Sequence, residues 1–489
     1  MLPDGTRDAL VSERENTMGT RQLSSFGIPS HTSPSSSTPG ALEPKAPYGS
    51  RRRFLKAIGA LTAAAGLAAC GPRRVGPGPH GSEIVQLVYQ DWQTDWFPGL
   101  AQKMLGQFHA QNPHLRVFYT PDPDDLNERM LADFQAGTAP DVVSGCCEFF
   151  PVWAQKGYLL DLRPYVAADL DRASMDDWDQ AQYRSFFTAN GYQFALPKYH
   201  GALALFYNKD WFDDAGVAYP DSSWDHDDYQ QAMAQLTRDR GTNSPPDRWG
   251  SMVDIAWERI QVHINGWGGH LVDPNNAYRS MMSRSEALAA MQWIRDRMWE
   301  DRTMASFLDV KNQETRQVFT QERIAMVEDG SWSLKDILEN ARFRVGVAPF
   351  PAGPARKVTL ATTDGYAIFA GTKYPDAAWE LLKFLTGAAY GRALARDHLL
   401  QPARASLIEE WVNAIREEYP GPAADVDIAA FAEGHLQGYS VVAEIFANMQ
   451  EARELTLSAW ERIFTLGQAQ LELMAEVSGQ IEDLQRASA

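Results

Sequence analysis

Hydrophobic and polar positions change their period along the chain, and these changes predict alternating strands and helices. Residues 83–90 (EIVQLVYQ) alternate like a strand, and apolar residues at helical spacing over 99–112 predict a helix. Residues 114–120 alternate again before a predicted helix over about 127–136, and 141–145 (DVVSG) suits a buried parallel strand. Strand, helix, strand and helix in this order predict an α/β layer with right-handed crossovers.

The same patterns continue through the rest of the chain. Leu203–Tyr207 is a predicted strand, and the Asn208 turn leads into a short helix over 211–215 that Gly216 ends. Ser222-Ser223-Trp224 is predicted to cap a further helix. Residues 405–489 have helical periodicity and are predicted to cover a lobe, because a coiled coil needs more heptads.

A basic segment and a short apolar run precede the first predicted strand. SRRRFLK (50–56) is followed by thirteen apolar or small residues over 57–69, fewer than the roughly 20 that span a bilayer as a helix. The alternative, a small buried Ala-rich helix, is disfavoured because the preceding residues are rich in Ser and Pro. The segment resembles a twin-arginine export signal that ends in a lipoprotein box, which implies lipid attachment at Cys70 and a flexible tether over 70–82.

The charge and the cysteine content of the chain limit the classes of partner and the disulfide bonds that can be expected. The chain has 489 residues with 45 Lys and Arg against 63 Asp and Glu, and removal of residues 1–69 changes the net charge from −18 to −21. Nucleic acid is therefore disfavoured, because phosphate binding needs a cationic surface. Cys146 and Cys147 are sequence neighbours, so no long-range disulfide framework is available; they are predicted to be small buried hydrophobes, with a strained vicinal disulfide as the alternative.

Eight segments in one order carry a family resemblance. They are FHAQNPHLRV, MLADFQAGTAPDVV, WAQKGYLLDLRPY, YQFALPKYHGALALFYNKDWFDDAGV, SSWDHDDYQQAMAQLT, FTQERIAMVEDGSW, VGVAPFPAGP and YPDAAWELLKFLTGAAYGRAL. Their order and spacing resemble the extracellular solute-binding proteins of carbohydrate ABC importers, the group that includes maltose-binding proteins. The resemblance implies an exported, monomeric, non-enzymatic protein without a cofactor or metal, whose partners are a sugar and membrane permease subunits.

The fold class that the resemblance implies is α/β, with two lobes of the type II periplasmic-binding-protein kind. Each lobe is a mostly parallel mixed sheet flanked by helices, and a hinge closes them on the solute. The expected N-terminal lobe comprises 83–199 and 345–370, and the C-terminal lobe 204–341 and 374–489. Crossings between lobes are expected near Pro197–Leu203, Arg342–Val347 and Phe369–Lys373.

A sugar site needs flat aromatic surfaces for C–H faces and planar polar groups for hydroxyls. The chain has 15 Trp, 17 Tyr and 22 Phe, and several of them fall in loops near the expected site. The candidate ligand-binding residues are Trp92, Trp96, Glu148, Tyr199, His200, Trp267, Asp329, Trp332, Asp364, Gly365 and Tyr366.

Three of these assignments come from the resemblance. Trp332 matches a family tryptophan that stacks on sugar, and Glu148 matches an acidic hydroxyl acceptor. Asp364, Gly365 and Tyr366 together match a glycine-rich return loop. Maltose-binding members place a sugar-binding Glu where this chain has Gly201, which puts maltodextrin in doubt and predicts space for a bulkier solute.

Two other functions stay open. A polyamine or other cation receptor of the same fold is compatible with the net charge, because aromatic and carboxylate groups form cages for cations. An exported glycosidase needs two carboxylates about 5–10 Å apart, and the sequence favours no such pair. No G-x-S-x-G, H-E-x-x-H, Walker or C-x-x-C motif occurs, so other common chemistries lack local support.

Overall fold

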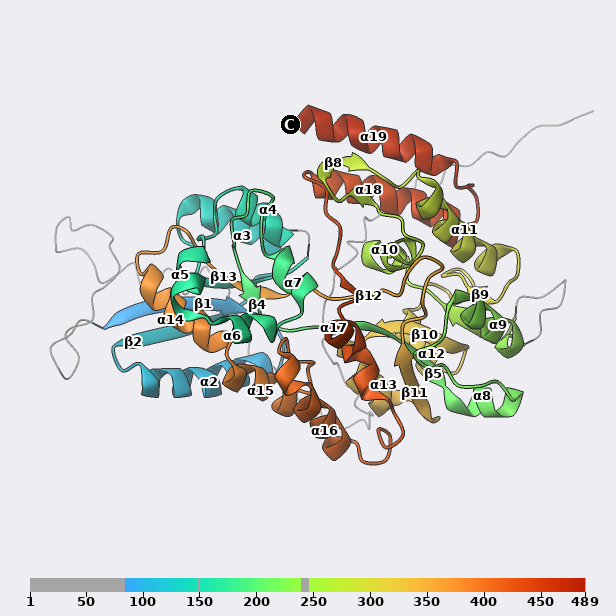
Figure 1. Cartoon of the computed structure of the whole chain (residues 1–489), viewed down its shortest axis with the longest axis horizontal. Coiled ribbons are helices and arrows are strands. Elements are labelled where there is room, and N and C mark those ends of the chain that lie inside the picture. The colour runs from blue at the N-terminus through green and yellow to red at the C-terminus, as the bar shows by residue number, and fades with distance from the viewer. Residues whose placement is uncertain (1–83, 148, 239–245, 489) are drawn as a thin grey trace, which may run out of the picture. The chain divides into compact units, whose positions relative to one another are not determined.

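Two five-stranded mixed sheets organise the chain (Figure 1), with strand orders β2-β1-β3-β13-β4 and β11-β5-β10-β6-β9. The computed structural model describes residues 84–147, 149–238 and 246–488. The predicted α/β class with helix-flanked mixed sheets is confirmed. The predicted export signal and Cys70 lie outside these residues.

The strands follow the predicted periodicity closely at the N-terminal end. The first sheet contains β1 (Val85–Asp91), β2 (Leu115–Pro121), β3 (Val142–Gly145), β4 (Leu196–Pro197) and β13 (Gly365–Ile368). The second contains β5 (Leu203–Asn208), β6 (Trp249–Met252), β9 (Met304–Ala305), β10 (Ile324–Gly330) and β11 (Val345–Pro349). Two smaller pairs are β7 (Val272–Asp273) with β8 (Asn276–Ser280), and β12 (Thr359–Leu360) with β14 (Ser440–Val441).

Helices fill the intervals between strands. Up to β4 they are α2 (Phe97–Gln111), α3 (Leu126–Ala136), α4 (Phe149–Gln155), α5 (Arg163–Asp169), α6 (Arg172–Asp176) and α7 (Gln180–Ser185). From β5 to β13 they are α8 (Lys209–Ala215), α9 (His226–Leu236), α10 (Trp257–Gly266), α11 (Ser285–Trp299), α12 (Thr315–Thr320) and α13 (Leu334–Asn340). After β13 they are α14 (Pro375–Leu385), α15 (Ala388–Asp397), α16 (Ile408–Glu418), α17 (Glu433–Gln437), α18 (Met449–Trp460) and α19 (Leu473–Ser488). Across all described residues, no helix combines the length and the apolarity that crossing a membrane requires.

Capping residues explain where several helices begin and end. The side chain of Asn208 accepts a hydrogen bond from the N–H of Trp211 (3.2 Å) at the start of α8, as predicted. Gly216 then ends α8 at φ +65°, in the left-handed region that favours glycine. The predicted cap at Ser222-Ser223-Trp224 is wrong by one residue, because Asp225 caps α9 through a capping box with Asp228.

Strand β3 of the first sheet is buried on both faces. Adjacent residues of a strand point to opposite faces, so Val142 packs with α2, α14 and α15, and Val143 packs with α3 and α4. Both residues are fully buried. Such a strand has no exposed face, which explains why DVVSG is an uninterrupted apolar run.

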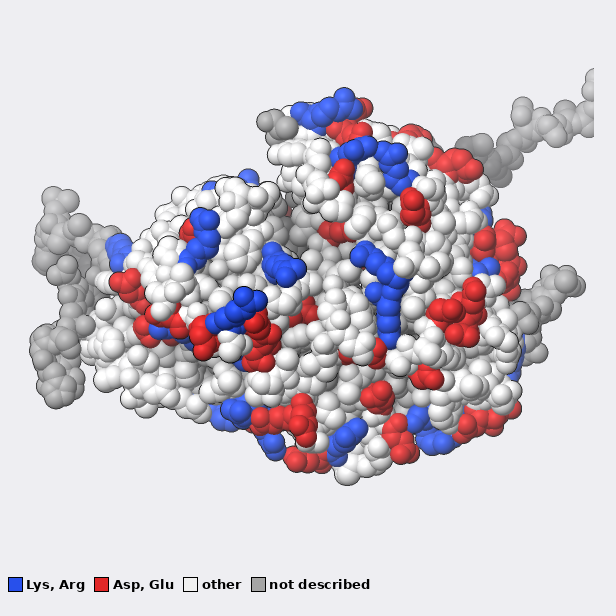
Figure 2. All heavy atoms as spheres, in the orientation of Figure 1, with Lys and Arg blue, Asp and Glu red and all other residues white. Residues whose placement is uncertain are grey.

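The second sheet also separates two cores. One contains the apolar faces of α9, α10, α11, α18 and α19, and the other contains those of α12, α13 and α16. The C-terminal helices therefore pack on the second sheet, which accounts for the amphipathic pattern of the last residues. Acidic and basic side chains are interspersed on the surface shown in Figure 2.

The chain passes between the sheets at one predicted place. Residues 198–202, called the first crossing below, connect β4 of the first sheet to β5 of the second. The crossing expected at Arg342–Val347 is wrong, because β11 pairs antiparallel with β5 and so stays in the second sheet. The return, called the second crossing, runs over 350–364, from β11 to β13.

The crossing expected at Phe369–Lys373 is also wrong. The helix that follows, α14, packs in the core of the first sheet, and α15 contributes Tyr390 and Leu394 to the same core. The chain returns to the second sheet after α15, since α16 packs in the core beside β11. The predicted lobe boundaries are therefore corrected at two places: 345–349 belongs to the second sheet, and 374–397 packs with the first.

Candidate functional site

A buried ion pair fixes the start of the first crossing to the first sheet. Asp91 is the last residue of β1 and Lys198 directly follows β4; their side chains pair and both are 0% exposed. The hydroxyl of Tyr366 donates to Asp91 Oδ2 (2.6 Å), and Tyr89 donates to the same oxygen. Burial and the charge of Asp91 raise the pKa of Tyr366 well above its usual value, so its hydroxyl stays a donor.

Aromatic rings surround this pair. The Nζ atom of Lys198 lies 3.2 Å from the centroid of the Trp92 ring, within the range of a cation–π interaction. Tyr199 meets the Trp92 ring in an edge-to-face contact with centroids 5.8 Å apart. The contacts with Lys198 and Tyr199 thus restrain the indole of Trp92, which remains half-buried.

The two crossings lie side by side. The N–H of Gly201 donates to Thr362 Oγ1 (3.0 Å), and the N–H of Thr362 donates to the carbonyl of Gly201 (2.8 Å). The N–H of Lys198 also donates to the carbonyl of Asp364 (3.1 Å). A rotation of one sheet relative to the other must therefore bend both segments together.

Trp332 packs against the first crossing. A Cβ atom on Gly201 would lie 2.6 Å from the indole of Trp332 and 2.8 Å from the methyl of Thr362. Only glycine fits there. The space that the sequence assigned to a bulkier solute is occupied by Trp332 itself, so that expectation is wrong.

On the second sheet, Asp329 near the end of β10 binds two arginines. Its carboxylate pairs with Arg259 of α10 (3.0 Å) and Arg316 of α12 (3.2 Å). Burial opposes ionisation, but the two guanidinium groups outweigh it and hold the pKa of Asp329 below its usual range. Arg259 lies 5.4 Å from the centroid of the Trp332 ring, and its Nη1 has no hydrogen-bond partner within the described chain.

Three half-buried carboxyl groups lie next to strand ends: Asp122 and Asp254 follow β2 and β6, and Asp364 precedes β13. Burial, reinforced by the charge of Asp91, raises the pKa of Asp122 to about 7. Burial also raises the pKa of Asp364 to about 6, although Lys198 opposes the shift, and it raises the pKa of Asp254 beside Arg259. Groups that titrate near neutrality both donate and accept hydrogen bonds, which suits hydroxyl ligands.

Tyr199 links the two sets of groups. Its hydroxyl faces Ser331, next to the Asp329 cluster, and neither hydroxyl has another hydrogen-bond partner in the described residues. Asp122 Oδ1 likewise has no partner there. Buried polar atoms usually have partners, so this concentration of unpaired ones marks a place for a polar ligand.

The predicted site residues divide into two groups. Trp92, Tyr199, Trp332 and Asp364 lie at or beside the two crossings, where the unpaired polar atoms gather. The others have different contacts, although His200 is itself in the first crossing and Trp96 meets the Trp92 ring edge-to-face; Glu148 is outside the described residues.

The other predicted site residues contact groups away from the unpaired polar atoms or position their neighbours. His200 is fully buried against Asp179 and Gln401, Trp267 packs on His226 with centroids 4.5 Å apart, and Trp96 stacks on His398 at 4.0 Å. Asp329, Gly365 and Tyr366 are buried in the sheets. Asp329 and Tyr366 thus position neighbouring groups, and Gly365 has no room for a side chain beside Phe186.

Sequence reasoning missed several charged residues of the site. Asp91, Asp122 and Asp254 come at or just after the ends of β1, β2 and β6. Parallel strands present their carboxyl ends at one edge, where α/β proteins bind ligands, so this position was a usable signal. Lys198 and Arg259 had no comparable local signal, because their importance depends on partners far away in the chain.

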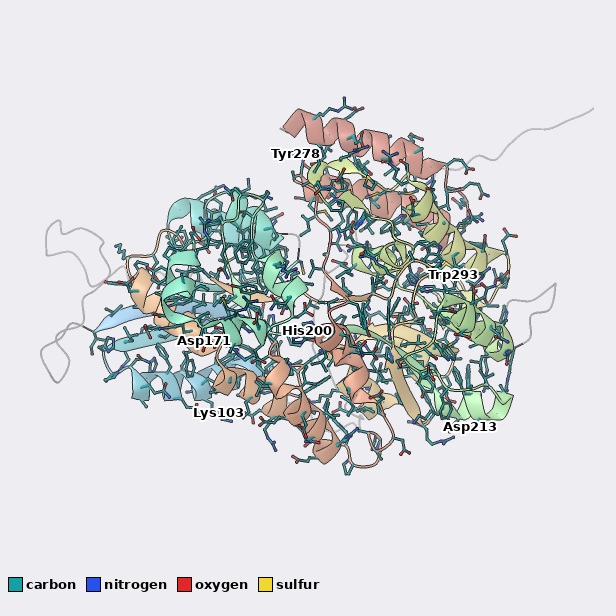
Figure 3. The ribbon with its side chains drawn as sticks, viewed as in Figure 1. Lys103, Asp171, His200, Asp213, Tyr278 and Trp293 are labelled. Carbon is teal, nitrogen blue, oxygen red and sulfur yellow. The ribbon has the colours of Figure 1, made fainter. Side chains whose placement is uncertain are left out.

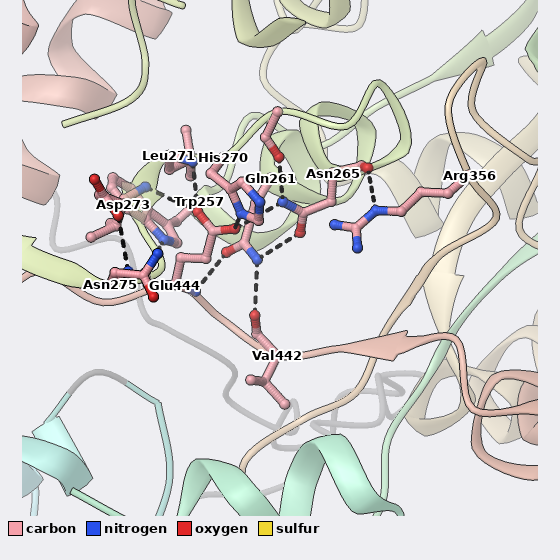
Figure 4. A network of polar contacts seen from close by, with 12 residues as sticks. Trp257, Gln261, Asn265, His270, Leu271, Asp273, Asn275, Arg356, Val442 and Glu444 are labelled. Carbon is pink, nitrogen blue, oxygen red and sulfur yellow. Dashed lines mark hydrogen bonds and ion pairs between the residues drawn. The ribbon is translucent and has the colours of Figure 1, made fainter. Parts of the chain in front are cut away.

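A C-terminal segment is tied to α10 next to this region (Figure 4). The carboxylate of Glu444 accepts from His270 Nδ1 and the backbone N–H of Leu271 (both 2.6 Å) and from Asn265 Nδ2 (2.8 Å). The backbone of Glu444 donates to Gln261 Oε1 (2.8 Å) and accepts from the indole N–H of Trp257 (2.9 Å). The backbone N–H of Val272 donates to the same carboxylate (3.0 Å), and these bonds together anchor the chain between β14 and α18 to the second sheet's core.

Known proteins are similar to this chain in sequence and in fold. The sequence profile of the bacterial extracellular solute-binding protein family matches residues 91–392. Relatives in sequence include a putative binding protein of Brucella abortus and the maltodextrin-binding protein MdxE of Bacillus subtilis.

 The Brucella abortus protein is 23% identical to this chain over 365 residues, which cover 73% of this chain and 82% of the relative. The MdxE alignment spans 394 residues at 22% identity, covering 76% of this chain and 87% of MdxE.

Solved structures are similar over most of the chain. An ABC substrate-binding protein of Listeria monocytogenes, solved with cycloalternan, has a TM-score of 0.67 and 22% identity, over 83% of this chain and 98% of its own. The GacH receptor of Streptomyces glaucescens, solved unliganded and with acarbose, has a TM-score of 0.63 and 22% identity, over 82% of this chain and 97% of its own. At these identities the likeness shows the fold.

Proposed function

The chain belongs to the family of bacterial extracellular solute-binding proteins, and we propose that it captures a carbohydrate outside the cytoplasmic membrane and delivers it to an ABC importer. The observation that carries the proposal is the set of polar atoms beside Trp92, Tyr199 and Trp332 that have no hydrogen-bond partner among the described residues. Aromatic faces suit the C–H surface of a sugar, and unpaired hydroxyl, carboxyl and guanidinium groups suit its hydroxyls.

The relatives support a sugar as the solute. MdxE is named for binding maltodextrin, and the GacH receptor was solved with acarbose. Arg259 and Asp254 on the second sheet and Asp122 and Asp364 on the first supply donors and acceptors from both sides. Closure of the two sheets about the paired crossings then surrounds the solute, and the closed form is what a permease recognises.

The chain performs no chemistry in this function. The solute leaves as it entered, because capture needs only a difference in affinity between the open and closed forms. We further propose that the mature protein is a monomer held at the outer face of the membrane through lipid on Cys70, after export by a twin-arginine signal.

A cation such as a polyamine is the second candidate, and two features count against it. Lys198 and Arg259 bring positive charge to the site, and burial favours the neutral forms of Asp122 and Asp364. A cation cage needs the opposite arrangement, with ionised carboxylates and no competing cation.

The test is a thermal-shift panel on the purified chain without residues 1–69. Mono-, di- and oligosaccharides are compared with spermidine and putrescine, since a solute that binds only the folded state raises Tm. We expect stabilisation by at least one carbohydrate and by neither polyamine. Stabilisation by the polyamines alone, or conversion of a glycan into new products, would contradict the proposal.

A further inference from the structure

Three side chains with metal-binding atoms meet at the first crossing. Asp179 caps the start of α7, His200 lies in the first crossing (Figure 3), and His435 lies in α17. One donor atom from each residue lies within 4.8 Å of the other two, and the two imidazole centroids are 5.1 Å apart. These three residues are called the hinge cluster below.

Two ring nitrogens of the hinge cluster have no hydrogen-bond partner in the described part of the chain. They are Nε2 of His200, whose side chain is fully buried, and Nδ1 of His435. Nε2 of His200 lies 3.4 Å from Asp179 Oδ2, a contact that becomes an ion pair only when the ring is protonated. A buried polar atom without a hydrogen-bond partner needs an explanation, and one ion coordinated by both rings would supply it.

The start of α7 fixes the orientation of the Asp179 carboxylate. Its Oδ1 atom accepts from the backbone N–H of Gln182 (2.9 Å), and its Oδ2 atom is the one that lies near His200.

Gln401 supplies the outer partner that metal-binding histidines normally have. Its side-chain amide lies 3.0 Å from His200 Nδ1, while its Oε1 atom has no partner in the described chain. As placed, Nε2 of Gln401 also donates to the carbonyl of Phe431 (3.4 Å). In the flipped amide orientation that bond is given up, Oε1 of Gln401 accepts a hydrogen bond from Nδ1 of His200, and Nε2 of His200 keeps its lone pair. A metal ligand whose second ring nitrogen donates to a carbonyl oxygen has this arrangement.

We propose that the hinge cluster binds one Zn²⁺ ion through Asp179, His200 and His435. Two imidazoles and one carboxylate with a fourth position for water are a common zinc ligand set. Zinc bonds of about 2.0–2.1 Å at tetrahedral angles separate neighbouring donors by about 3.4 Å, which matches the distance between His200 Nε2 and Asp179 Oδ2. Small rotations of the side chains bring the third donor to the same separation.

The bound ion connects three separate segments. It joins the first crossing to α7 and to α17, and so restrains the backbone that must bend when the sheets rotate. Zinc is thereby expected to change the stability of the chain and the ease of closure, while the solute groups around Trp332 keep their contacts. Zinc binding at the hinge cluster does not depend on which solute the chain captures.

The experiment is a zinc titration of the EDTA-stripped full mature chain, followed by calorimetry and by metal analysis after gel filtration. We expect one Zn²⁺ per chain and an increase in Tm on adding zinc. Replacing zinc by Co²⁺ should give the visible absorption of a tetrahedral cobalt site. Lack of saturable binding at one equivalent would overturn the proposal.

Two variants separate ligation from folding. His435→Ala removes a half-buried ligand, and Asp179→Asn keeps the cap oxygen of α7 but removes the charge. Each is expected to weaken zinc binding by at least about 100-fold, beyond the 10–100-fold typical of outer partners. The control His114→Ala, at an exposed histidine, should bind zinc like the unmodified chain. Unchanged zinc affinity in folded Asp179→Asn, or equal losses in all three variants, would overturn the assignment.

Discussion

Each sheet buries a carboxylate at the end of a strand, and the two are neutralised differently. Asp91 of the first sheet has one lysine and the hydroxyls of two tyrosines, and its ion pair is fully enclosed. Asp329 of the second sheet has two arginines, and one of them, Arg259, keeps an unpaired Nη1. The first arrangement fixes the position of a crossing, whereas the second holds a cation ready for another partner.

The largest expected effect comes from breaking the enclosed pair. Lys198→Met leaves Asp91 buried without its cation, which should lower the free energy of unfolding by about 3–5 kcal/mol in urea denaturation. The matched control is Lys103→Met, because Lys103 pairs with Asp397 at the surface with side chains 55% and 39% exposed. That change should cost less than about 1 kcal/mol. Similar losses in both variants would contradict the distinction between an enclosed and an exposed pair.

The next effect tests the contact between Trp332 and the first crossing. Gly201→Ala places a methyl group 2.6 Å from the indole, which should destabilise the chain by about 1–3 kcal/mol through overpacking. Gly106→Ala in α2 is the control, since nothing lies within 4 Å of its added Cβ. It should stabilise the helix by about 0.5–1 kcal/mol. An unchanged melting temperature in Gly201→Ala would show that Trp332 does not pack there.

The third prediction is a pH dependence of stability that arises from Asp122, next to the first sheet. The pKa of Asp122 is raised from 3.8 to about 7, so the folded state holds a proton that the unfolded state has lost. Stability therefore falls as pH rises from about 4 to 7, by at most about 1.4 kcal/mol per pH unit. Asp122→Asn should remove this fall in solute-free denaturation curves. The exposed neighbour Asp124→Asn should keep the fall, and a fall that persists in Asp122→Asn would assign it to another group.

On the second-sheet side, His226 gives stability the opposite dependence on pH. Burial, with His263 beside it, lowers the pKa of His226 from 6.5 to about 3, so the unfolded state binds the proton first. Its contribution destabilises the fold as pH falls from about 6.5 to 3, again by at most about 1.4 kcal/mol per pH unit. His226→Gln should flatten that acid limb when unfolding is followed by tryptophan fluorescence. An acid limb of unchanged slope would exclude His226 as its source.

Local patterns in the sequence predicted elements better than partners. Alternation placed β1 and β2 within a residue or two, because one face of each strand is more buried than the other. The same pattern could not assign β11 to a sheet, since its partner β5 lies far earlier in the chain. Strand pairing is non-local information that periodicity does not contain.

The site was predictable to a similar extent. Aromatic residues in loops led to Trp92, Tyr199 and Trp332, because large apolar groups outside periodic runs stand out in a sequence. Trp267 has the same local signal but packs on His226 and Trp293, so the signal does not separate a ligand surface from a core. Lys198 and Arg259 needed the structure, because an ordinary cation acquires its role from the carboxylate that it meets.

The central claim is that a neutral carbohydrate binds against Trp332 without being altered. Its most direct measurement is calorimetric titration of the stabilising carbohydrate into the unmodified chain, Trp332→Ala and the control Trp267→Phe, at low and high salt. We predict a loss of about 10-fold or more in affinity for Trp332→Ala, equal to about 1.4 kcal/mol, with little change for Trp267→Phe or with salt. Full affinity in Trp332→Ala, or affinity in the unmodified chain that falls steeply with ionic strength, would contradict the claim.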